Sequence, residues 1–297
     1  IAVPYESHLY NRIYPLVRGA DLGQPAVRER VVRAILRTRD LRQWSPRPSL
    51  EATLAAIRRP GFHGIVEALL ESWTGSRGKR RWGEKTPHHT FCWRTILEGF
   101  PDLKVVHVVR DGRDVALSFL AAPFGPKHVY QAALHWIRYV ESAEAAGAVL
   151  GEGGFLAVRY EDLVGAPERE LRRICAFLGE DYDPAMLSYH GRGVAYPTDP
   201  RNLQNLTRPV LADTRGRWRT GMTAREQRIF EAVAGAHLER YGYSRVMGRA
   251  RLTDWERLCC RYIEHPPRRL LGMLTNRKSY GFALESLRLS LTLRLSL

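Results

Sequence analysis

The chain has 297 residues, a formal net charge of +15 and 44% hydrophobic residues, which suits one large α/β domain with an appendage. Four cysteines, two of them adjacent, argue against a disulfide framework and against zinc-ligand spacing. Such a positive charge is typical of proteins that bind nucleic acid, anionic lipid or an anionic ligand, and an arginine-rich composition is the alternative for part of it. No helix-turn-helix, zinc-finger or RNA-binding aromatic motif accompanies the charge, which argues against specific nucleic-acid binding.

The first hundred residues are predicted to be mainly helical. Residues 1–20 are expected to form a loop that enters a helix, and 75–83 a basic loop. Apolar residues recur at helical spacing in 50–57, 64–73 and 91–97.

A β-branched run at 105–109 predicts a buried strand, and it ends at Arg110. The turn that follows starts a helix that Asp111 or Asp114 can cap. Arg110 therefore stands at the carboxyl end of a strand, where open α/β sheets bind ligands, and Ser118 lies about one turn into the helix. A guanidinium and a hydroxyl at a helix start suit a phosphate group. The alternative is a surface arginine and a packed serine in an ordinary strand-turn-helix unit.

The pattern of strand, helix and strand then recurs. Residues 130–150 are predicted to form a helix that Gly151 and the next residues end, and 155–160 a second short strand. This order predicts a parallel sheet flanked by helices. A capping box at 223–226 opens a helix to about Tyr241.

The character of the chain changes after residue 244. Residues 245–297 hold eleven Lys or Arg against four acids, and 287–297 alternate with the period of a strand. This basic, leucine-rich segment is expected to pack on the domain or pair as an edge strand; peripheral contact with an anionic membrane is the alternative. No apolar run approaches the ~18 to 20 residues that span a bilayer.

Seven short segments follow one another along the chain: a Lys-Thr-Pro motif in 82–89, Phe-Pro-Asp-Leu-Lys at 100–104, Arg110 with Ser118, Arg-Tyr-Glu-Asp-Leu at 159–163, a helix ending in Phe-Leu-Gly at 177–179, a late loop at 209–218, and Gly-Tyr at 242–243. Their order resembles that in sulfotransferases that use 3′-phosphoadenosine 5′-phosphosulfate (PAPS), especially the bacterial and tyrosylprotein enzymes. The resemblance covers most of residues 1–244. It implies a three-layer α/β sandwich with a central parallel sheet flanked by helices, similar to P-loop proteins.

One element of that family is missing from the sequence. Members begin with a strand and a Gly-Thr-Thr-type loop whose N–H groups wrap the 5′-phosphosulfate. This chain opens at Ile1 with residues that resemble the segment after that loop. We therefore expect 1–244 to be an N-terminally incomplete domain without its first strand and P-loop, impaired in activity, and 245–297 to be an extension.

The resemblance also implies roles on the donor side. Arg110 and Ser118 match the residues that hold the 3′-phosphate, and Tyr160 matches a tyrosine that contacts the cofactor, although it would otherwise be a core aromatic at a strand end. Arg208 and Arg217 lie in the late loop and are candidates for phosphate contact among many arginines.

Two further residues match the groups that take part in the transfer itself. Glu6 falls where related enzymes carry a glutamate base, and Lys85 matches a lysine that neutralises the sulfuryl group and the bridging oxygen. A capping or ion-paired Glu6 and a solvated Lys85 are the alternatives. His88 and His89 offer a rival base, but loop histidines without a catalytic task are the preferred interpretation.

The sequence thus predicts an enzyme that moves a sulfuryl group from PAPS to a hydroxyl of a carbohydrate, a small molecule or a tyrosine, without a metal. A basic non-catalytic module that binds nucleic acid or an anionic membrane is the alternative, and a nucleotide kinase of the same fold is a third hypothesis. A cytoplasmic, and alternatively membrane-peripheral, location is expected. Acceptor identity and oligomeric state carry no signal in the sequence.

Overall fold

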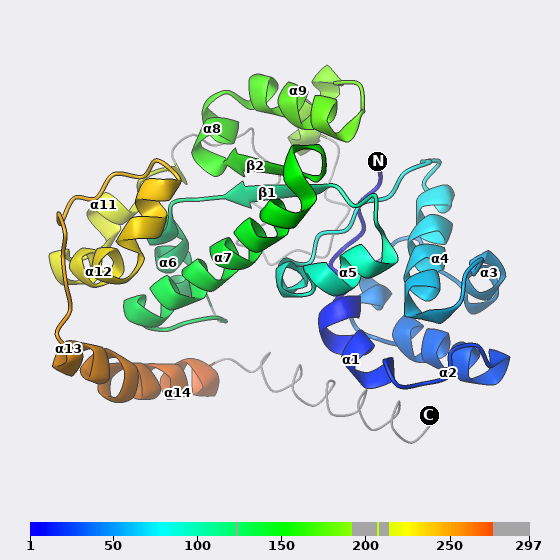
Figure 1. Cartoon of the computed structure of the whole chain (residues 1–297), viewed down its shortest axis with the longest axis horizontal. Coiled ribbons are helices and arrows are strands. Elements are labelled where there is room, and N and C mark those ends of the chain that lie inside the picture. The colour runs from blue at the N-terminus through cyan, green and yellow to red at the C-terminus, as the bar shows by residue number, and fades with distance from the viewer. Residues whose placement is uncertain (123, 192–206, 208–213, 276–297) are drawn as a thin grey trace. The chain divides into compact units, whose positions relative to one another are not determined.

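The chain forms two compact units in a computed structural model that describes residues 1–122, 124–191, 207 and 214–275. Of these residues, Ile1–Leu103 belong to the first unit and those from Lys104 onward to the second. The first unit is helical, and its elements follow in chain order (Figure 1): η1 (Leu9–Ile13), α1 (Tyr14–Val17), α2 (Pro25–Leu36), η2 (Leu41–Gln43), α3 (Leu50–Ala56), α4 (Gly61–Ser76), η3 (Pro87–Phe91) and α5 (Trp93–Gly99).

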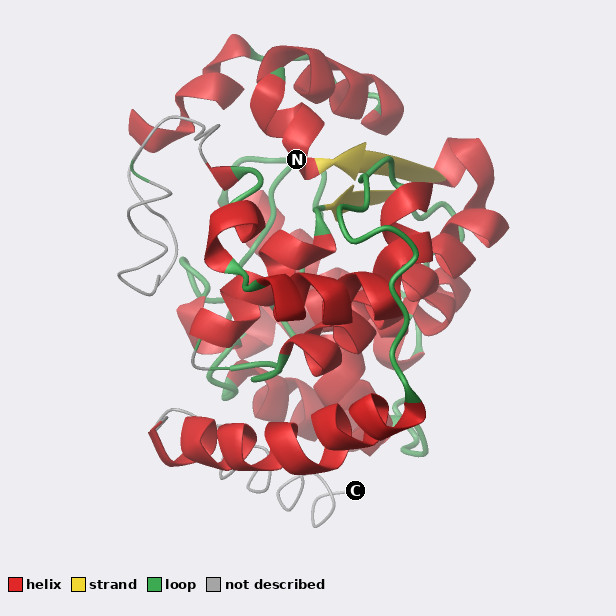
Figure 2. Ribbon diagram, turned by 90° about the vertical axis from the view of Figure 1, so that its left-hand side faces the viewer, coloured by secondary structure: helices red, strands yellow, loops and turns green. Residues whose placement is uncertain are grey.

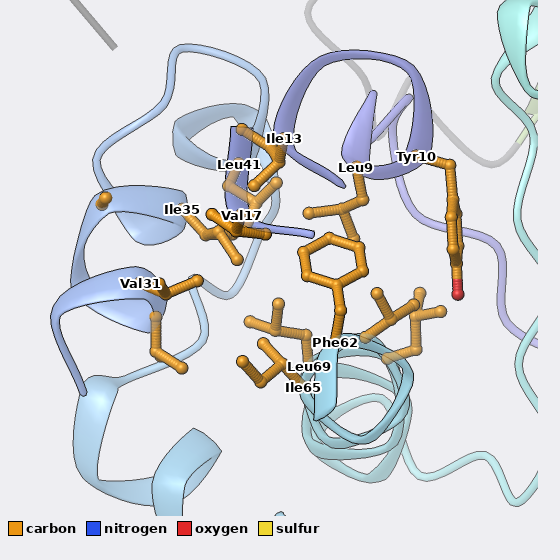
Figure 3. Packing of buried hydrophobic residues seen from close by; sticks show 14 of the residues in the cluster. Leu9, Tyr10, Ile13, Val17, Val31, Ile35, Leu41, Phe62, Ile65 and Leu69 are labelled. Carbon is orange, nitrogen blue, oxygen red and sulfur yellow. The ribbon is translucent and has the colours of Figure 1, made fainter. Parts of the chain in front are cut away.

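The core of the first unit lies between α4, α2 and the helical turns near the N-terminus. Phe62 of α4 lies in the middle of the cluster and points toward Leu9 (Figure 3). Ile65 and Leu69, one and two turns along α4, are fully buried, as the helical spacing of the apolar residues requires. This core holds the N-terminal residues, including those before η1, against the rest of the unit.

The second unit contains both strands of the described sheet. Its elements are β1 (Val105–Val109), α6 (Gly112–Ala121), α7 (Val129–Gly154), β2 (Phe155–Arg159), α8 (Tyr160–Gly165), α9 (Pro167–Leu178), η4 (Pro184–Gly191), α11 (Trp218–Gly221), α12 (Ala224–Arg240), α13 (Asp254–Leu258), η6 (Cys259–Glu264) and α14 (His265–Thr275). The predicted helix at 130–150, the helix predicted to end in Phe-Leu-Gly at 177–179 and the predicted strand at 155–160 are confirmed to within a few residues.

Strands β1 and β2 pair in parallel, as the sequence predicts. Figure 2 shows the two arrows side by side and pointing the same way. The register places Val105 opposite Phe155 and Val109 opposite Arg159. Helix α7 connects the strands and packs on both of them, with α6 and α12 packed on α7. Because the strands end in register, Arg110 and Tyr160 leave the sheet at the same edge.

The expectation that 105–109 is a buried strand is wrong at Val108. Val109 is 2% exposed, but Val108, whose side chain points the other way, is 47% exposed. Parallel strands are normally covered on both faces. Val106, on the same side of the strand as Val108, is partly buried, so the exposed position on this side of β1 is Val108.

The start of α6 is fixed by its cap and by close packing. The side chain of Asp111 accepts a hydrogen bond from the Arg113 backbone N–H at 2.9 Å, so Asp111 rather than Asp114 is the N-cap. A Cβ at Gly112 would lie 2.6 Å from the Trp136 ring and 2.7 Å from Phe230. Glycine therefore lets α6 approach α7 and α12 directly behind the strand end.

The C-terminal part of the described chain belongs to the second unit and contributes to its core. The predicted capping box is present, with reciprocal bonds between Thr223 and Glu226 at the start of α12. Leu252 and Cys260, which follow α12, belong to the core of this unit. The boundary predicted after residue 244 stays a prediction, and the strand pattern at 287–297 lies outside the described residues. No helix within those residues is both long and apolar enough to cross a membrane.

Candidate functional site

Glu6 and Lys85 lie together in the first unit, although 79 residues separate them in the sequence. The Lys85 ammonium donates a hydrogen bond to the Glu6 carboxylate and forms an ion pair with it. The Glu6 side chain is 24% exposed and that of Lys85 is 66% exposed. The structure therefore brings the predicted base and the predicted cation into direct contact, with the ammonium on the solvent side.

Two histidines surround the Glu6 carboxylate. His8 Nε2 lies 3.5 Å from Glu6 Oε2, and the His8 and His88 rings are 5.9 Å apart between centroids. Burial alone raises the pKa of Glu6, but hydrogen bonds from His8 and Lys85 outweigh burial and lower it to about 2. Glu6 is therefore a carboxylate at neutral pH, and its two oxygens interact with Lys85 and His8.

The segment that carries Glu6 runs parallel to the segment that carries Lys85. Ala2 forms a parallel bridge with Trp82, in which the Gly83 N–H donates to the Ala2 carbonyl at 2.8 Å. Further along, the Trp44 indole N–H donates to the Tyr5 carbonyl at 2.8 Å. These bonds fix the backbone just before Glu6 and just before Lys85.

Glu84 and Thr86, the neighbours of Lys85, bind the residues that follow Glu6. Glu84 Oε1 accepts hydrogen bonds from the Ser7 hydroxyl at 2.8 Å and from the Thr86 hydroxyl at 2.5 Å. Thr86 Oγ1 in turn accepts from the backbone N–H groups of Ser7 at 3.1 Å and His8 at 3.4 Å. Sequence reasoning missed this network, because its partners are 77 to 79 residues apart.

His89 is part of the same network and is not placed as a base. It is 7% exposed, its Nδ1 lies 2.7 Å from Glu84 Oε2, and its Nε2 lies 3.2 Å from the backbone nitrogen of Tyr10. Since the Tyr10 N–H must donate, Nε2 accepts and Nδ1–H donates to Glu84. Both ring nitrogens are thus occupied, in agreement with the preference for histidines without a catalytic task.

Arg110 in the second unit is held by three groups at the edge of the sheet. Its guanidinium lies 4.6 Å from the centre of the Tyr160 ring, donates to the Thr214 carbonyl, and is 3.6 Å from Asp114 Oδ2. The Tyr160 hydroxyl lies 2.8 Å from Thr214 Oγ1, which makes Tyr160 a partner of Arg110 rather than a core aromatic alone.

Asp114 ties this arginine to the loop that leads into α11. Its fully buried carboxylate accepts backbone N–H bonds from Gly216 at 2.8 Å and Trp218 at 2.9 Å. One turn later in α6, the Ser118 hydroxyl donates to the Asp114 carbonyl at 3.0 Å. Arg110, Tyr160 and Ser118 thus share one neighbourhood around Asp114 and Thr214.

The two arginines predicted in the late loop are placed less favourably. Arg217 is exposed at the start of α11, where its carbonyl accepts the Gly221 N–H, and Arg208 lies outside the described residues. Arg110 fits an anionic ligand better, because its Nε is buried and has no hydrogen-bond partner among the described residues. The roles predicted for Arg110, Ser118 and Tyr160 in binding the donor stay predictions.

A cluster of metal-ligating residue types was not predicted. His128, Cys260 and Glu264 place their ligand atoms within 4.8 Å of one another. However, His128 Nδ1 accepts the Tyr130 N–H at 3.2 Å, so Nε2 carries the hydrogen and donates to Glu264 at 3.0 Å. Arg225 occupies both Glu264 oxygens. The geometry is that of a hydrogen-bonded ion pair, which fastens η6 to the start of α7.

Comparison with known proteins gives one consistent family. Residues 4–184 match the sequence profile of the sulfotransferase family. A relative from Mycobacterium tuberculosis, omega-hydroxy-beta-dihydromenaquinone-9 sulfotransferase Stf3, is 27% identical over 184 residues, which are 54% of this chain and 41% of that protein. Protein-tyrosine sulfotransferase of Drosophila melanogaster is 24% identical over 201 residues, which are 64% of this chain and 40% of that protein. The chain thus spans about two fifths of the length of these relatives.

Solved structures show the same fold. The sulfotransferase domain of the Synechococcus PCC 7002 olefin synthase superposes with a TM-score of 0.52 at 22% identity, covering 81% of this chain and 85% of that domain. The sulfotransferase domain from the curacin biosynthetic pathway superposes with a TM-score of 0.51 at 16% identity, covering 81% of this chain and 88% of that domain. The α/β fold predicted for the chain is thereby confirmed.

Proposed function

The chain belongs to the sulfotransferase family, and on this basis we propose that it transfers a sulfuryl group from PAPS to an acceptor hydroxyl. The observation that carries the proposal is the direct contact between Glu6 and Lys85, a carboxylate and an ammonium from distant parts of the sequence. Sulfuryl transfer requires both a group that takes the hydroxyl proton and a cation that stabilises the charge on the departing oxygen.

In this proposal Glu6 is the general base. As the acceptor oxygen forms its bond to sulfur, Glu6 takes the hydroxyl proton, and the bond between sulfur and the bridging oxygen breaks. PAPS supplies the sulfuryl group and leaves as adenosine 3′,5′-bisphosphate. Lys85 stabilises the negative charge that develops on the bridging oxygen, a task that a compact ammonium performs well.

The ion pair between Glu6 and Lys85 corresponds to a resting arrangement. A carboxylate whose pKa is about 2 is a weak base. The exposed Lys85 side chain can turn to the sulfuryl group, and Glu6 then loses one of the hydrogen bonds that lower its pKa. The base therefore becomes stronger when the cation is engaged by the donor, which links proton removal to donor binding.

Arg110 and Ser118 are proposed to hold the 3′-phosphate of the donor, with Tyr160 beside Arg110. The buried Arg110 Nε, which lacks a partner among the described residues, supports this role, because it leaves one donor of the guanidinium available. The acceptor is proposed only as a hydroxyl compound, since relatives are named for menaquinone, protein tyrosine and carbohydrate acceptors.

Calorimetric binding of adenosine 3′,5′-bisphosphate tests the donor. We expect binding by the wild type and a loss of roughly tenfold to a hundredfold in Arg110→Ala, as for a charged hydrogen bond. Arg172→Ala is the matched control, because Arg172 also lies over a tyrosine, Tyr182, and pairs with a carboxylate. If the wild type does not bind, the proposal that PAPS is the donor is wrong. If all three proteins bind with equal affinity, Arg110 does not hold the 3′-phosphate.

We also propose that the second unit contacts an anionic membrane surface. Large apolar side chains that are 49% to 69% exposed gather in one short stretch of α13, η6 and α14: Trp255, Leu258, Tyr262, Ile263 and Leu270. Exposed arginines accompany them: Arg257, Arg261, Arg268 and Arg269. Glu256 and Glu264 are paired with Arg228 and Arg225, so the four exposed arginines outnumber the one remaining acidic residue of the stretch, Asp254. Apolar and basic side chains together support interfacial binding.

Vesicle sedimentation of the full chain tests this contact. We expect binding to vesicles of phosphatidylcholine with phosphatidylglycerol, weaker binding at high salt, and little binding to phosphatidylcholine alone. Trp255→Ser should weaken binding several-fold, whereas Val149→Ser should not, because Val149 is 57% exposed on α7. Equal binding of the two variants, or no preference for anionic vesicles, would contradict the proposal. A cytoplasmic location stays a prediction.

A further inference from the structure

We infer that Glu84, together with Thr86 and His89, is a positioning group that holds the Glu6 carboxylate against Lys85. The inference rests on the proposed function of Glu6 and Lys85 and assigns a role to neighbouring residues that do not themselves react. Glu84 and Thr86 stand on either side of Lys85, and both bind the backbone or side chain of the residues after Glu6.

The hydrogen-bond network around Glu84 is closed. Ser7 is 2% exposed, Thr86 5% and His89 7%, and the Glu84 side chain is 17% exposed. Every one of these groups has its partner inside the network or on the Tyr10 backbone. Burial raises the pKa of Glu84, but bonds from His89, Thr86 and Ser7 outweigh burial and keep it below the ordinary value. Glu84 is therefore ionised and accepts all these bonds at once.

The network also imposes an uncommon backbone conformation close to Glu6. His8 has φ 53°, in the left-handed region that residues other than glycine seldom adopt. Such a conformation persists only where the surroundings determine it. The bond from the His8 N–H to Thr86 Oγ1 is one such determinant, and it leaves His8 Nε2 3.5 Å from Glu6 Oε2.

Glu84 is expected to affect the rate through the position of Glu6 rather than through its own charge. Glu84 does not contact the acceptor side directly, since its two oxygens are bound by Ser7, Thr86 and His89. A general base must meet its proton within hydrogen-bond distance, and a displacement of about 1 Å can cost about a hundredfold in rate. Loss of the network is thus expected to lower kcat while donor binding, assigned to the second unit, stays unchanged.

The test uses Glu84→Gln, Thr86→Val and the conservative Thr86→Ser. Glutamine cannot accept at all the sites that Glu84 does, and valine removes the hydroxyl of Thr86 at nearly constant shape. We expect kcat to fall tenfold to a hundredfold in Glu84→Gln and Thr86→Val, with the KM for PAPS within twofold, and to recover in Thr86→Ser. Tyr10→Phe is the matched control, because it removes the buried bond from Tyr10 to His63 in the same unit and leaves the network in place.

A readout that does not need turnover separates this inference from the proposed function. The carboxyl carbon of Glu6, assigned by its loss in Glu6→Gln, is titrated by NMR over the range where circular dichroism shows a folded protein. In the wild type and Tyr10→Phe we expect no midpoint near 4.5; in Glu84→Gln we expect the midpoint to rise toward 4.5. An unchanged Glu6 titration in Glu84→Gln and Thr86→Val would overturn the inference. A shifted titration in a chain that neither binds nor uses PAPS would overturn only the proposed function.

Discussion

Each unit of the chain contains a carboxylate next to a residue of the candidate site, partly buried in the first unit and fully buried in the second, and the two carboxylates bind different kinds of partner. In the first unit Glu84, beside Lys85, binds mostly side chains: two hydroxyls and an imidazole. In the second unit Asp114, near Arg110, binds two backbone N–H groups, that of Gly216 in the loop before α11 and that of Trp218 at the start of α11.

This difference separates two ways of organising a site. Glu84 fixes the side chains and backbone around a pair of groups proposed to react, so small changes there are expected to alter the rate. Asp114 fixes the course of a loop that supplies the Thr214 carbonyl to Arg110, so changes there are expected to alter ligand affinity. The comparison therefore predicts that rate and affinity can be changed separately, one in each unit.

The largest effect is expected from Glu6→Gln. Removing a general base typically lowers the rate by about 10² to 10⁴. We expect this fall in turnover of PAPS, measured with labelled sulfate, while the affinity for adenosine 3′,5′-bisphosphate stays within twofold. The control is Glu67→Gln, since Glu67 pairs with Arg59 in the same unit away from Glu6. A parallel loss of affinity in Glu6→Gln would show that rate and affinity cannot be changed separately in the two units.

Asp114→Asn is expected to have the next largest effect. Asparagine offers one acceptor oxygen where Asp114 offers two, so the N–H of Gly216 or Trp218 loses its bond in a fully buried place. The free energy of unfolding should fall by about 1 to 3 kcal/mol, and binding of adenosine 3′,5′-bisphosphate should weaken as well. Urea unfolding and calorimetry measure the two quantities. Unchanged affinity with lowered stability would mean that the loop does not support Arg110.

Glu84 is expected to make stability depend on pH. Its pKa in the folded chain lies below the ordinary value, so its contribution is complete above that value and is lost as the pH falls through the folded pKa. Glu84→Gln should therefore unfold at lower urea than the wild type at pH 7, with a difference of about 1 to 2 kcal/mol that shrinks below pH 4. A difference that stays constant from pH 7 to acid would contradict the ionised state of Glu84.

Much of the fold could be predicted because its signals are local. The run at 105–109, the Asp111 cap and the Thr223 capping box each lie within a few residues, and all three elements are present. Helix α2 was not predicted, although Val31 and Ile35 recur at helical spacing and both are fully buried. The exposed face of Val108 could not be predicted either, because exposure of a strand depends on which elements cover it.

The residues proposed to react could be found from the sequence, and the polar network around them could not. Glu6 and Lys85 were identified through motifs that resemble a family, and their contact is visible in the structure. The bonds from Glu84 to Ser7, like the pairing of His128 with Glu264, join residues far apart in the chain and follow no spacing rule. Polar networks of this kind are fixed by tertiary packing, which a single sequence does not display.

The smallest effect is expected from Ser118→Ala, and it tests whether the second unit binds through side chains as well as through its loop. The Ser118 hydroxyl donates to the Asp114 carbonyl and has acceptor and donor capacity left for a phosphate oxygen. Its removal should weaken binding of adenosine 3′,5′-bisphosphate by roughly twofold to tenfold, equivalent to about 0.5 to 1.5 kcal/mol. Ser49→Ala is the control, because Ser49 caps α3 in the first unit, where its loss should lower stability and leave affinity unchanged. If Ser118→Ala binds as tightly as the wild type, the phosphate is held by Arg110 and the loop alone. The first unit would then be organised through side chains, and the second through the backbone of its loop.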